Sequence, residues 1–400
     1  ALAALLTAGS AHGAGFAIKG QSATALGNAF AGATAGAEDL SYMFFNPAAL
    51  GRFDGNQAQL AVSGIITKLK LDDSTASTTA GTPVTGSDTD DDAAHDALVP
   101  AFYAMASPHE QIRLGVGVNV PFGLGTEYND GWVGRYHAIE STFETVNINP
   151  VIAVKATDWL TLAAGAQIQY AEAELSNAID FGSLGAANAV PGAVPTQQDG
   201  QARGKGDGWA YGYNLGPHAE PVKGRQIGPS YRSKIDTTFA GKARVRLDDA
   251  GIGATLKGAT GAFANTGAET KFEFPPMAGI GVHQAIGEDF AVMAEAQWTG
   301  WSTLDELIIE FDNPSQPDNL TEYQWDDSWF FALGGSWDAT ESLKLRVGVA
   351  YDQSPVRNRY RSPRVPDSDR YWLAAGLGRQ IREHFSLDVR YTHIFFHDAD

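Results

Sequence analysis

Hydrophobic and polar residues alternate with a period of two along most of the chain beyond residue 56. In the segment 112–123, bulky apolar side chains take every even position, whereas Gly, Asn, Pro or Arg takes every odd one. Successive side chains of a β-strand point to opposite faces, so this segment has one apolar face and one small or polar face. The same alternation recurs in 146–154, 160–170, 209–216, 343–351 and 385–392. It predicts an all-β protein.

Further strand candidates bring the total to about thirteen. They lie near 57–72, 98–108, 226–243, 269–286, 290–311, 321–338 and 366–381. The connections alternate between tight turns, at 107–110, 156–158 and 286–289, and long polar loops, of which Asp72–Ala97 and Ser176–Asp207 are the clearest. Short turns on one side and long loops on the other are typical of a membrane barrel.

A soluble β-sandwich would also alternate, so the distribution of aromatic residues helps to decide between the two architectures. Most tryptophans lie where predicted strands begin or end, as in the interfacial girdles of membrane barrels; they are Trp159, Trp209, Trp298, Trp301, Trp325, Trp329, Trp337 and Trp372. We therefore predict a transmembrane antiparallel β-barrel over 57–400. Bacterial barrels have an even strand count, so fourteen strands are expected, with the last one cut off after 397–400.

The stretch before the barrel, residues 14–56, is rich in Gly and Ala and contains the turn Asn46-Pro47-Ala48. Small residues dominate 23–37, where Leu26 and Phe30 are the bulky exceptions. A helix over 23–37 would lie very close to a surrounding wall, so we interpret 14–56 as a plug inside the barrel. The alternative is a flexible Gly/Ala leader.

Export from the cytoplasm is suggested by residues 1–13, an apolar stretch that ends in small residues like the end of a signal peptide. A short buried helix start is the alternative. The chain has no Cys, which suits passage through an oxidising compartment. Its net charge of −19 argues against nucleic acid as a partner. Beyond the first dozen residues there is no apolar run long enough for a transmembrane helix.

Other clusters with possible chemistry give no enzyme or metal site. Asp88–Asp92 resembles a calcium loop but lacks the Gly and Glu that an EF-hand needs, so we expect a solvated loop and no bound metal. His283 and Glu295 are the best candidates for a hydrolase, but we interpret them as a lumenal polar pair and keep the hydrolase as the alternative. Arg357, Arg359, Arg361 and Arg364, near Asp367 and Asp369, are interpreted as a charged outer loop that is solvated or faces lipopolysaccharide, and a ligand clamp is the alternative. No cofactor is expected.

Short motifs along the chain resemble those of the FadL/TodX family of outer-membrane transporters for long-chain fatty acids and hydrocarbons. They occur in the family's order and cover nearly the whole chain: AGF at 14–16, ALGNAFAG at 25–32, NPA at 46–48, PFGL at 121–124, GWVGRY at 131–136, TVNINP at 145–150, YRSK at 231–234, TGWS at 299–302 and PDSDRYW at 366–372.

The resemblance implies a fourteen-stranded barrel with an N-terminal hatch in the outer membrane of a Gram-negative bacterium. The implied function is passive uptake of hydrophobic molecules, which outer loops capture, a lumenal pocket beside the hatch receives, and a kink in the third strand releases sideways. The expected partners are the ligand, membrane lipid and lipopolysaccharide, and the barrel is expected to act as a monomer. A barrel without such transport, either a hydrolase or a general porin, is the alternative.

By position, the kinked strand is 112–123. Pro121 lacks a backbone N–H, and Gly115, Gly117 and Gly123 permit a bulge, so this strand cannot pair continuously with its neighbour. Hatch backbone, or polar groups such as Asn119 and Asn46, would have to fill the gap in lipid. We therefore expect the turn Asn46-Pro47-Ala48 to pack against this strand. An edge-strand Pro without a gate is the alternative.

Apolar residues near the mature terminus and in the outer loops are candidates for the walls of the ligand pocket; they are Phe16, Ile18, Phe122, Leu124, Trp132, Val133, Phe181 and Leu184. Arg135 is the candidate partner for a carboxylate head. Asn177 and Ile308 stand where fatty acid transporters of the family carry basic residues, which favours a hydrocarbon or aromatic ligand. A second departure is Pro217, which interrupts a predicted strand.

Overall fold

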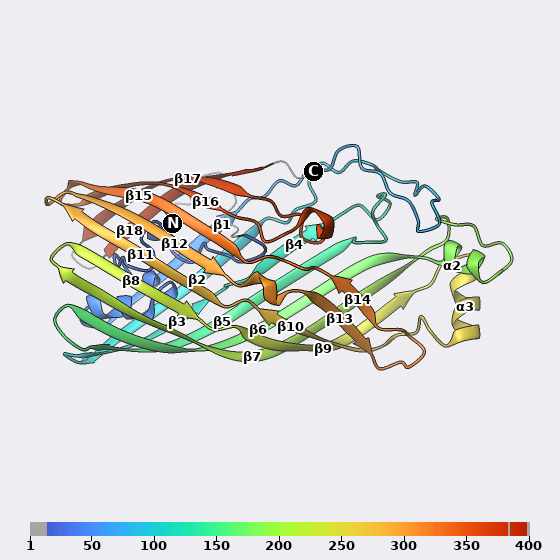
Figure 1. The fold of residues 1–400 in the computed structure, drawn as a ribbon, viewed down its shortest axis with the longest axis horizontal. Helices are drawn as coiled ribbons and strands as arrows, with labels where there is room; N and C mark the ends of the chain where they lie inside the picture. The colour runs from blue at the N-terminus through green and yellow to red at the C-terminus, as the bar shows by residue number, and fades with distance from the viewer. Residues whose placement is uncertain (1–13, 383–384, 398–400) are drawn as a thin grey trace.

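The computed structural model describes residues 14–382 and 385–397, and antiparallel β-strands dominate it (Figure 1). The predicted signal peptide over 1–13 lies outside the described residues. In the first half of the chain the strands are β1 (Gln57–Ile65), β2 (Ala97–His109), β3 (Ile112–Asn119), β4 (Gly123–Glu127), β5 (Glu140–Lys155), β6 (Leu160–Asp180), β7 (Asp199–Val222), β8 (Arg225–Arg232) and β9 (Ile235–Arg246). In the second half they are β10 (Thr266–Phe274), β11 (Met277–Ile286), β12 (Phe290–Thr299), β13 (Glu306–Phe311), β14 (Asn319–Glu322), β15 (Ser328–Thr340), β16 (Leu343–Asp352), β17 (Arg370–Arg382) and β18 (Phe385–Phe396).

The described residues form 18 strands because five of the predicted strands are each interrupted once. The segment 112–123 contains the start of such a pair, β3 followed by β4. The other interrupted strands are β8 with β9, β10 with β11, β12 with β13 and β14 with β15. The remaining predicted strands are continuous. The expected fourteenth strand lies outside the described residues.

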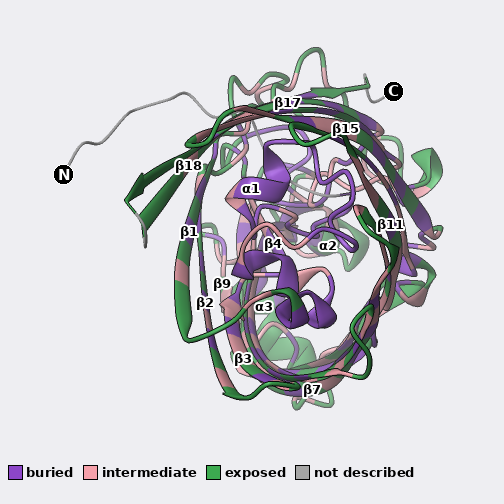
Figure 2. Ribbon diagram, turned by 90° about the vertical axis from the view of Figure 1, so that its left-hand side faces the viewer, coloured by how far each residue is buried: buried purple, intermediate pink, exposed green. Residues whose placement is uncertain are grey.

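Neighbouring strands pair in antiparallel fashion from β1 and β2 round to β17 and β18, and the sheet curls into a wall (Figure 2). The predicted all-β antiparallel fold is confirmed. Within 14–382 and 385–397 no strand ladder joins β18 to β1, so the structure shows the wall without its closure. One guanidinium N–H of Arg390 does cross from β18 and donates to the Val62 carbonyl at 2.9 Å. No helix in the described part of the chain is long and apolar enough to cross a membrane.

Side-chain burial in the wall is the reverse of that in a soluble sheet. On β5, Val146 and Ile148 face outward, whereas Asn147 and Asn149 are buried. This is the arrangement expected when the outer face contacts lipid. Trp209 and Trp329 are exposed on the outer face, as the girdle prediction requires.

The girdle prediction is wrong for three tryptophans, which are buried inside the wall; they are Trp301, Trp325 and Trp372. A position near a strand end does not reveal which face a side chain takes where the strand is interrupted.

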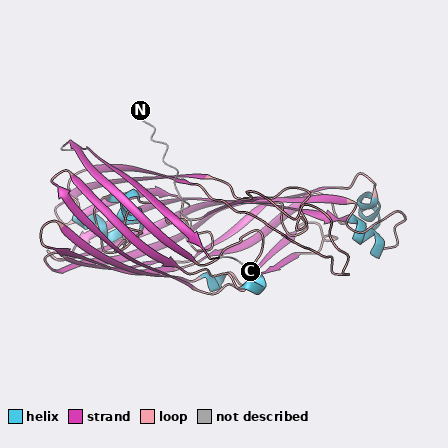
Figure 3. Ribbon diagram, turned by 90° about the horizontal axis from the view of Figure 1, so that it is seen from above, coloured by secondary structure: helices cyan, strands magenta, loops and turns pink. Residues whose placement is uncertain are grey.

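The predicted loop Ser176–Asp207 is strand at both ends and loop or helix only in 181–198. β6 continues to Asp180 and β7 begins at Asp199, with residue pairs along the whole length. The alternation of apolar and polar residues is absent here because charged residues alternate with glycines in 203–208. Neither face of this part of the strand is apolar. At the tip, the short helices α2 (Phe181–Ala187) and α3 (Ile252–Thr260) pack against each other beyond the strands (Figures 1 and 3).

The N-terminal segment, residues 14–56, lies inside the curled sheet and is almost entirely buried (Figure 2). Its short helices are α1 (Ala23–Leu26) and the 3-10 helices η1 (Leu40–Phe44) and η2 (Pro47–Arg52); two further 3-10 turns in the chain are η3 (Trp301–Thr303) and η4 (Asn358–Tyr360). The predicted helix over 23–37 is wrong beyond Leu26, because Ala29 and Phe30 take positive φ angles of 54° and 60°.

Small residues nevertheless bring this backbone against the wall, as expected. A Cβ added at Gly348 of β16 would overlap the carbonyl of Asn28.

The position of Asn46 explains Pro217. The ladder between β7 and β8 holds at Leu215 with Tyr231, is absent over the next three residue pairs, and resumes in the same register at Ala219 with Ile227. Pro217 and Pro229 face each other in this break, and neither can donate a ladder bond. The Asn46 amide donates to the Pro217 carbonyl at 3.0 Å and also to the Thr34 carbonyl at 2.7 Å.

The sequence predicts that the Asn46-Pro47-Ala48 turn packs against 112–123. In the structure, the helix η2 that follows does reach β3, where Leu50 lies over Gly115. Asn46 itself is directed at β7. The gap in the third strand is filled by other residues.

We predict that Asn46→Leu destabilises the protein. The change removes two buried hydrogen bonds and the cap that Asn46 provides to η2, and it leaves the Pro217 carbonyl unpaired. The expected loss is about 2 kcal/mol or more. Thermal unfolding of the purified protein in detergent should show an apparent Tm lower by several degrees, whereas Asn188→Leu at the exposed tip should leave it unchanged. Equal Tm values for wild type and Asn46→Leu would contradict this reading of the break.

Candidate functional site

The strand interruptions between β8 and β15 lie side by side at one level of the wall. Met277, the first residue of β11, pairs with Arg232 at the end of β8 and with Thr299 at the end of β12. On the other side of the interruption, Phe274 of β10 pairs with Ile235 of β9. A Pro-Pro step at 275–276 and the turn η3 separate the two halves of their strands.

An aromatic cluster built around Phe16 fills the centre of this level. The Phe16 ring lies 4.7 Å from the indole of Trp301 and 5.3 Å from the ring of Phe143. Gly15, with φ of 67°, precedes it where any Cβ would meet Trp301, so the close approach requires glycine. The Gly15 N–H donates to the carboxylate of Asp367 at 2.8 Å. The start of the N-terminal segment is thereby fixed inside the wall.

An apolar pocket of about 680 Å³ opens beside this cluster. Its walls are mainly aromatic and aliphatic side chains, with few polar groups; they include Phe16, Leu124, Phe143, Phe239, Phe272, Leu304, Leu307, Ile309, Tyr323 and Val365. Such a lining suits the tail of a hydrophobic molecule.

The apolar pocket continues outward into a larger cavity of about 1700 Å³, which we call the vestibule. The two share Phe239, Tyr323 and Arg364 among their lining residues. Five basic side chains line the vestibule, together with two acidic ones, Glu269 and Asp318. Arg203 and Lys205 are ion-paired with Glu140, Glu172 and Glu174, so the other three basic residues, Lys242, Arg244 and Arg364, carry the positive charge of the lining. A basic entrance would raise the local concentration of anions.

Arg364 stands where the vestibule meets the apolar pocket. Its guanidinium donates to the hydroxyl of Ser141 at 2.9 Å and to the carbonyl of Glu140 at 3.2 Å. Weaker contacts reach the carbonyl of Ser176 and the side chain of Asn177. Among the described residues no carboxylate forms an ion pair with it. Burial lowers the pKa of this guanidinium from its usual value, since desolvation disfavours the charged form.

The ladder is broken between β3 and β4, at a place that we call the β3–β4 opening, and the N-terminal segment covers this break from inside. Ala17 and Phe122 form an antiparallel bridge, flanked by a bond from the Ile18 N–H to the Pro121 carbonyl and one from the Gly123 N–H to the Phe16 carbonyl. Just below, the Gln21 side chain bonds both the N–H and the carbonyl of Val120. Backbone of the N-terminal segment therefore pairs with the strand at its break. Asn119 instead accepts from Asn147 at 3.2 Å.

On the inner side of the Phe16–Ile18 stretch lies a separate chamber, bounded by the N-terminal segment and the wall. Ile18 and Pro121 line it on the side of the β3–β4 opening. Its charged lining residues are Lys19, Arg232 and Asp352.

The family model described as outer membrane protein transport protein (OMPP1/FadL/TodX) matches residues 4–400 of the chain. The chain belongs to this family. FadL/TodX proteins are outer-membrane transporters of hydrophobic compounds, and the predicted location in a Gram-negative outer membrane is confirmed.

Named relatives agree with this assignment. The chain is 30% identical to a putative outer membrane protein of Neisseria meningitidis serogroup B, covering 100% of this chain and 89% of the relative. It is 27% identical to the long-chain fatty acid transport protein of Escherichia coli K12, covering 97% and 89%. The crystal structure of a Pseudomonas aeruginosa FadL homologue superposes with a TM-score of 0.83 at 25% identity, covering 96% and 92%. The toluene transporter TbuX of Ralstonia pickettii shares the fold, with a TM-score of 0.66 at 17% identity over 92% and 91%.

Within this FadL/TodX structure, the predicted ligand residues fall into separate groups. Phe16 and Leu124 line the apolar pocket, Phe122 packs beneath it against Phe16, and Ile18 lines the inner chamber. Trp132 and Val133 belong to a different buried cluster, in which Trp132 stacks on Tyr128 at 4.4 Å.

Two more predicted ligand residues lie at the outer tip. Phe181 is buried against α3, and Leu184 is partly exposed on α2. Neither lines the apolar pocket.

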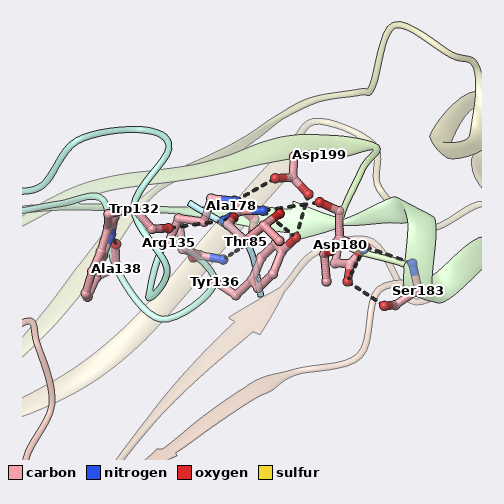
Figure 4. Close-up of polar contacts among 11 residues, drawn as sticks. Thr85, Trp132, Arg135, Tyr136, Ala138, Ala178, Asp180, Ser183 and Asp199 are labelled. Carbon is pink, nitrogen blue, oxygen red and sulfur yellow. Dashed lines mark hydrogen bonds and ion pairs between the residues drawn. The ribbon is translucent and has the colours of Figure 1, made fainter. Parts of the chain in front are cut away.

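Arg135 connects outer loops through polar contacts (Figure 4). It does not line the apolar pocket. Its guanidinium is buried, forms an ion pair of 2.6 Å with Asp199, and donates to the carbonyls of Thr85 and Thr196. The Tyr136 hydroxyl donates to the same carboxylate at 2.7 Å. In the described structure the charge of Arg135 is therefore compensated by Asp199 and lies away from the apolar pocket.

The candidate hydrolase pair is not assembled. Glu295 accepts from the N–H and the hydroxyl of Thr34, both at 3.1 Å, and no hydrogen bond between His283 and Glu295 is present in the described structure. His283 is paired across the ladder with Met293, two positions from Glu295.

Sequence reasoning did not find Arg364, Tyr323 or the phenylalanines at 239 and 272 as pocket residues. Arg364 was grouped with its solvated neighbours in 357–364, and this interpretation is wrong because its side chain folds inward to Ser141. Arg364 lies two residues before the family motif at 366–372, and this position could have indicated a role in the site.

We predict that Arg135→Met loosens the outer loops without abolishing the fold, because Asp199 then loses its buried partner. Limited digestion with proteinase K should cleave within 128–139 at least several-fold faster than in wild type, as read by mass spectrometry. Arg357→Met removes an exposed ion pair with Asp326 and should leave the digestion pattern as it is. Identical digestion of Arg135→Met and wild type would show that the Arg135–Asp199 ion pair is not needed to hold the outer loops together.

Proposed function

We propose that this protein passively takes up amphipathic hydrophobic molecules with an anionic head, such as long-chain carboxylates, across the outer membrane. The observation that carries the proposal is Arg364, a partly buried guanidinium at the mouth of an apolar pocket, which bonds only neutral groups of the described residues. A carboxylate would supply the missing countercharge through a bidentate, charge-assisted contact.

This proposal shifts the ligand class away from the hydrocarbons that Asn177 and Ile308 suggest. The Arg364 guanidinium lies 3.4 Å from the side-chain oxygen of Asn177. Arg364, from a different loop, therefore places a positive charge next to the position where Asn177 replaces a basic residue. The E. coli relative named as a long-chain fatty acid transport protein supports the same class. The toluene transporters share only the fold.

For the route, we propose capture in the basic vestibule, entry of the tail into the apolar pocket and lateral release through the β3–β4 opening. The N-terminal segment acts as the hatch. Release requires Phe16–Ile18 to leave Phe122, which breaks two backbone hydrogen bonds that flank a single bridge. A segment that fills the interior of the wall also argues against a general porin, which needs an open polar lumen.

We predict that Arg364→Met lowers uptake of labelled palmitate by about 10- to 100-fold, the value of one charge-assisted contact. Uptake of toluene, which has no head group, should stay within about twofold. The measurement uses cells that carry this protein as their sole transporter of the class. Arg357→Met in the exposed outer loop is the matched control and should transport both compounds normally. If palmitate uptake survives Arg364→Met, the head-group assignment fails.

We predict that a disulfide between Ala17→Cys and Phe122→Cys locks the opening. Ala17 and Phe122 form a non-hydrogen-bonded antiparallel pair, because the two backbone hydrogen bonds lie on either side of it. The two Cα atoms of such a pair are close enough for a disulfide. The native chain has no Cys to interfere. Oxidised cells should lose palmitate uptake at least tenfold and regain it with reductant, whereas each single variant should be insensitive to both treatments. Undiminished uptake in the oxidised double variant would refute release at this place.

A further inference from the structure

A second buried guanidinium lies deeper, in the inner chamber. Arg232 is the last residue of β8 and is 8% exposed. It donates to the side-chain oxygen of Gln167 on β6 and, at 2.9 Å, to the carbonyl of Phe44 in the N-terminal segment. Its guanidinium carbon lies 4.6 Å from the centre of the Phe44 ring. All three contacts are to neutral groups.

No carboxylate forms an ion pair with Arg232 in the part of the chain that the structure describes. A buried charge is normally paired, because removal from water is otherwise expensive. Neutral acceptors and an aromatic ring lessen this penalty without cancelling the charge. Arg232 thus resembles Arg364 in being a cation that the protein leaves uncompensated.

The other charges of the chamber do not compensate Arg232. Lys19 donates to Gln297 at 2.7 Å and lies 4.1 Å from the ring centre of Phe330. Asp352 also lines the chamber, so one further cation and one anion face it. The charges of Lys19 and Asp352 cancel, so the lining of the chamber keeps one net positive charge, that of Arg232.

The position of the chamber relates this charge to the route. Phe16 lines the apolar pocket, whereas Ala17 and Ile18, the next two residues, line the chamber. The stretch that seals the β3–β4 opening therefore lies between the two spaces. A molecule released from the apolar pocket by movement of Phe16–Ile18 would reach the chamber next.

We propose that the inner chamber is a second binding site for the anionic head group, with Arg232 as its ligand-binding residue. This inference rests on the function proposed above, because it assumes an amphipath with an anionic head. The head group leaves Arg364 when the Phe16–Ile18 stretch moves and binds Arg232 beside Gln167 and Phe44. The chamber takes the head, and the tail points toward the β3–β4 opening, where Ile18 and Pro121 form an apolar edge.

The test measures binding of palmitate and of 1-hexadecanol, which has the same chain without the charge, to the purified protein in detergent. Wild type should bind two equivalents of palmitate. Arg232→Met should bind one, with affinity for the lost equivalent reduced about 10- to 100-fold, and should bind hexadecanol like wild type. Arg364→Met should lose the other equivalent. Arg357→Met is the control without effect.

Arg232→Lys separates ligand binding from a structural role. It keeps the charge but cannot contact Gln167 and Phe44 in the same way. Retention of the second palmitate equivalent by Arg232→Lys, together with its loss in Arg232→Met at unchanged Tm, supports the site.

Two palmitate equivalents in Arg232→Met, or equal loss of palmitate and hexadecanol, overturn the inner site. If Arg364→Met still loses one equivalent in that case, the proposed function stands alone. If wild type binds no palmitate, the proposed function itself fails.

Discussion

The structure depends on backbone hydrogen bonds that the wall cannot make for itself. In lipid every unpaired N–H or C=O costs several kcal/mol, so a barrel tolerates a broken ladder only where protein covers it. The N-terminal segment does this at two places. Its backbone pairs with Pro121 and Gly123 beside the β3–β4 break, and the Asn46 amide bonds to Pro217 beside the β7–β8 break. The segment and the wall therefore determine each other's conformation.

The same dependence makes opening possible. A continuous ladder would have to lose many bonds at once, whereas the β3–β4 break is sealed by one bridge and the Gln21 contacts. Elsewhere the segment is fixed more firmly, by buried rings such as Phe30 and by close backbone packing at Gly348. A local displacement of the first residues can thus occur while the rest of the plug stays in place.

Local chemistry explains which features could be predicted from the sequence. Alternation located all the long strands, because lipid on one side and a polar interior on the other leave a period-two signal. Pro121 identified its break because a missing N–H is a property of one residue. The partner of Asn46 and the inward position of Trp301 depend on pairings distant in sequence, which no local pattern contains. The β6–β7 extension was missed because charged residues alternating with glycines carry no apolar signal.

Arg364 shows most clearly why the site was harder to predict than the fold. Its sequence neighbours are solvated, but its contacts come from Ser141 and Asn177, about two hundred residues away. The chain contains 47 acidic and 28 basic residues, so a buried arginine could easily be given a carboxylate partner, as Arg135 is by Asp199. Arg364 and Arg232 instead bond only neutral groups of the described chain. Because repulsion by the acidic surface opposes an anionic ligand, two uncompensated cations on the inside give that ligand a favourable path inward.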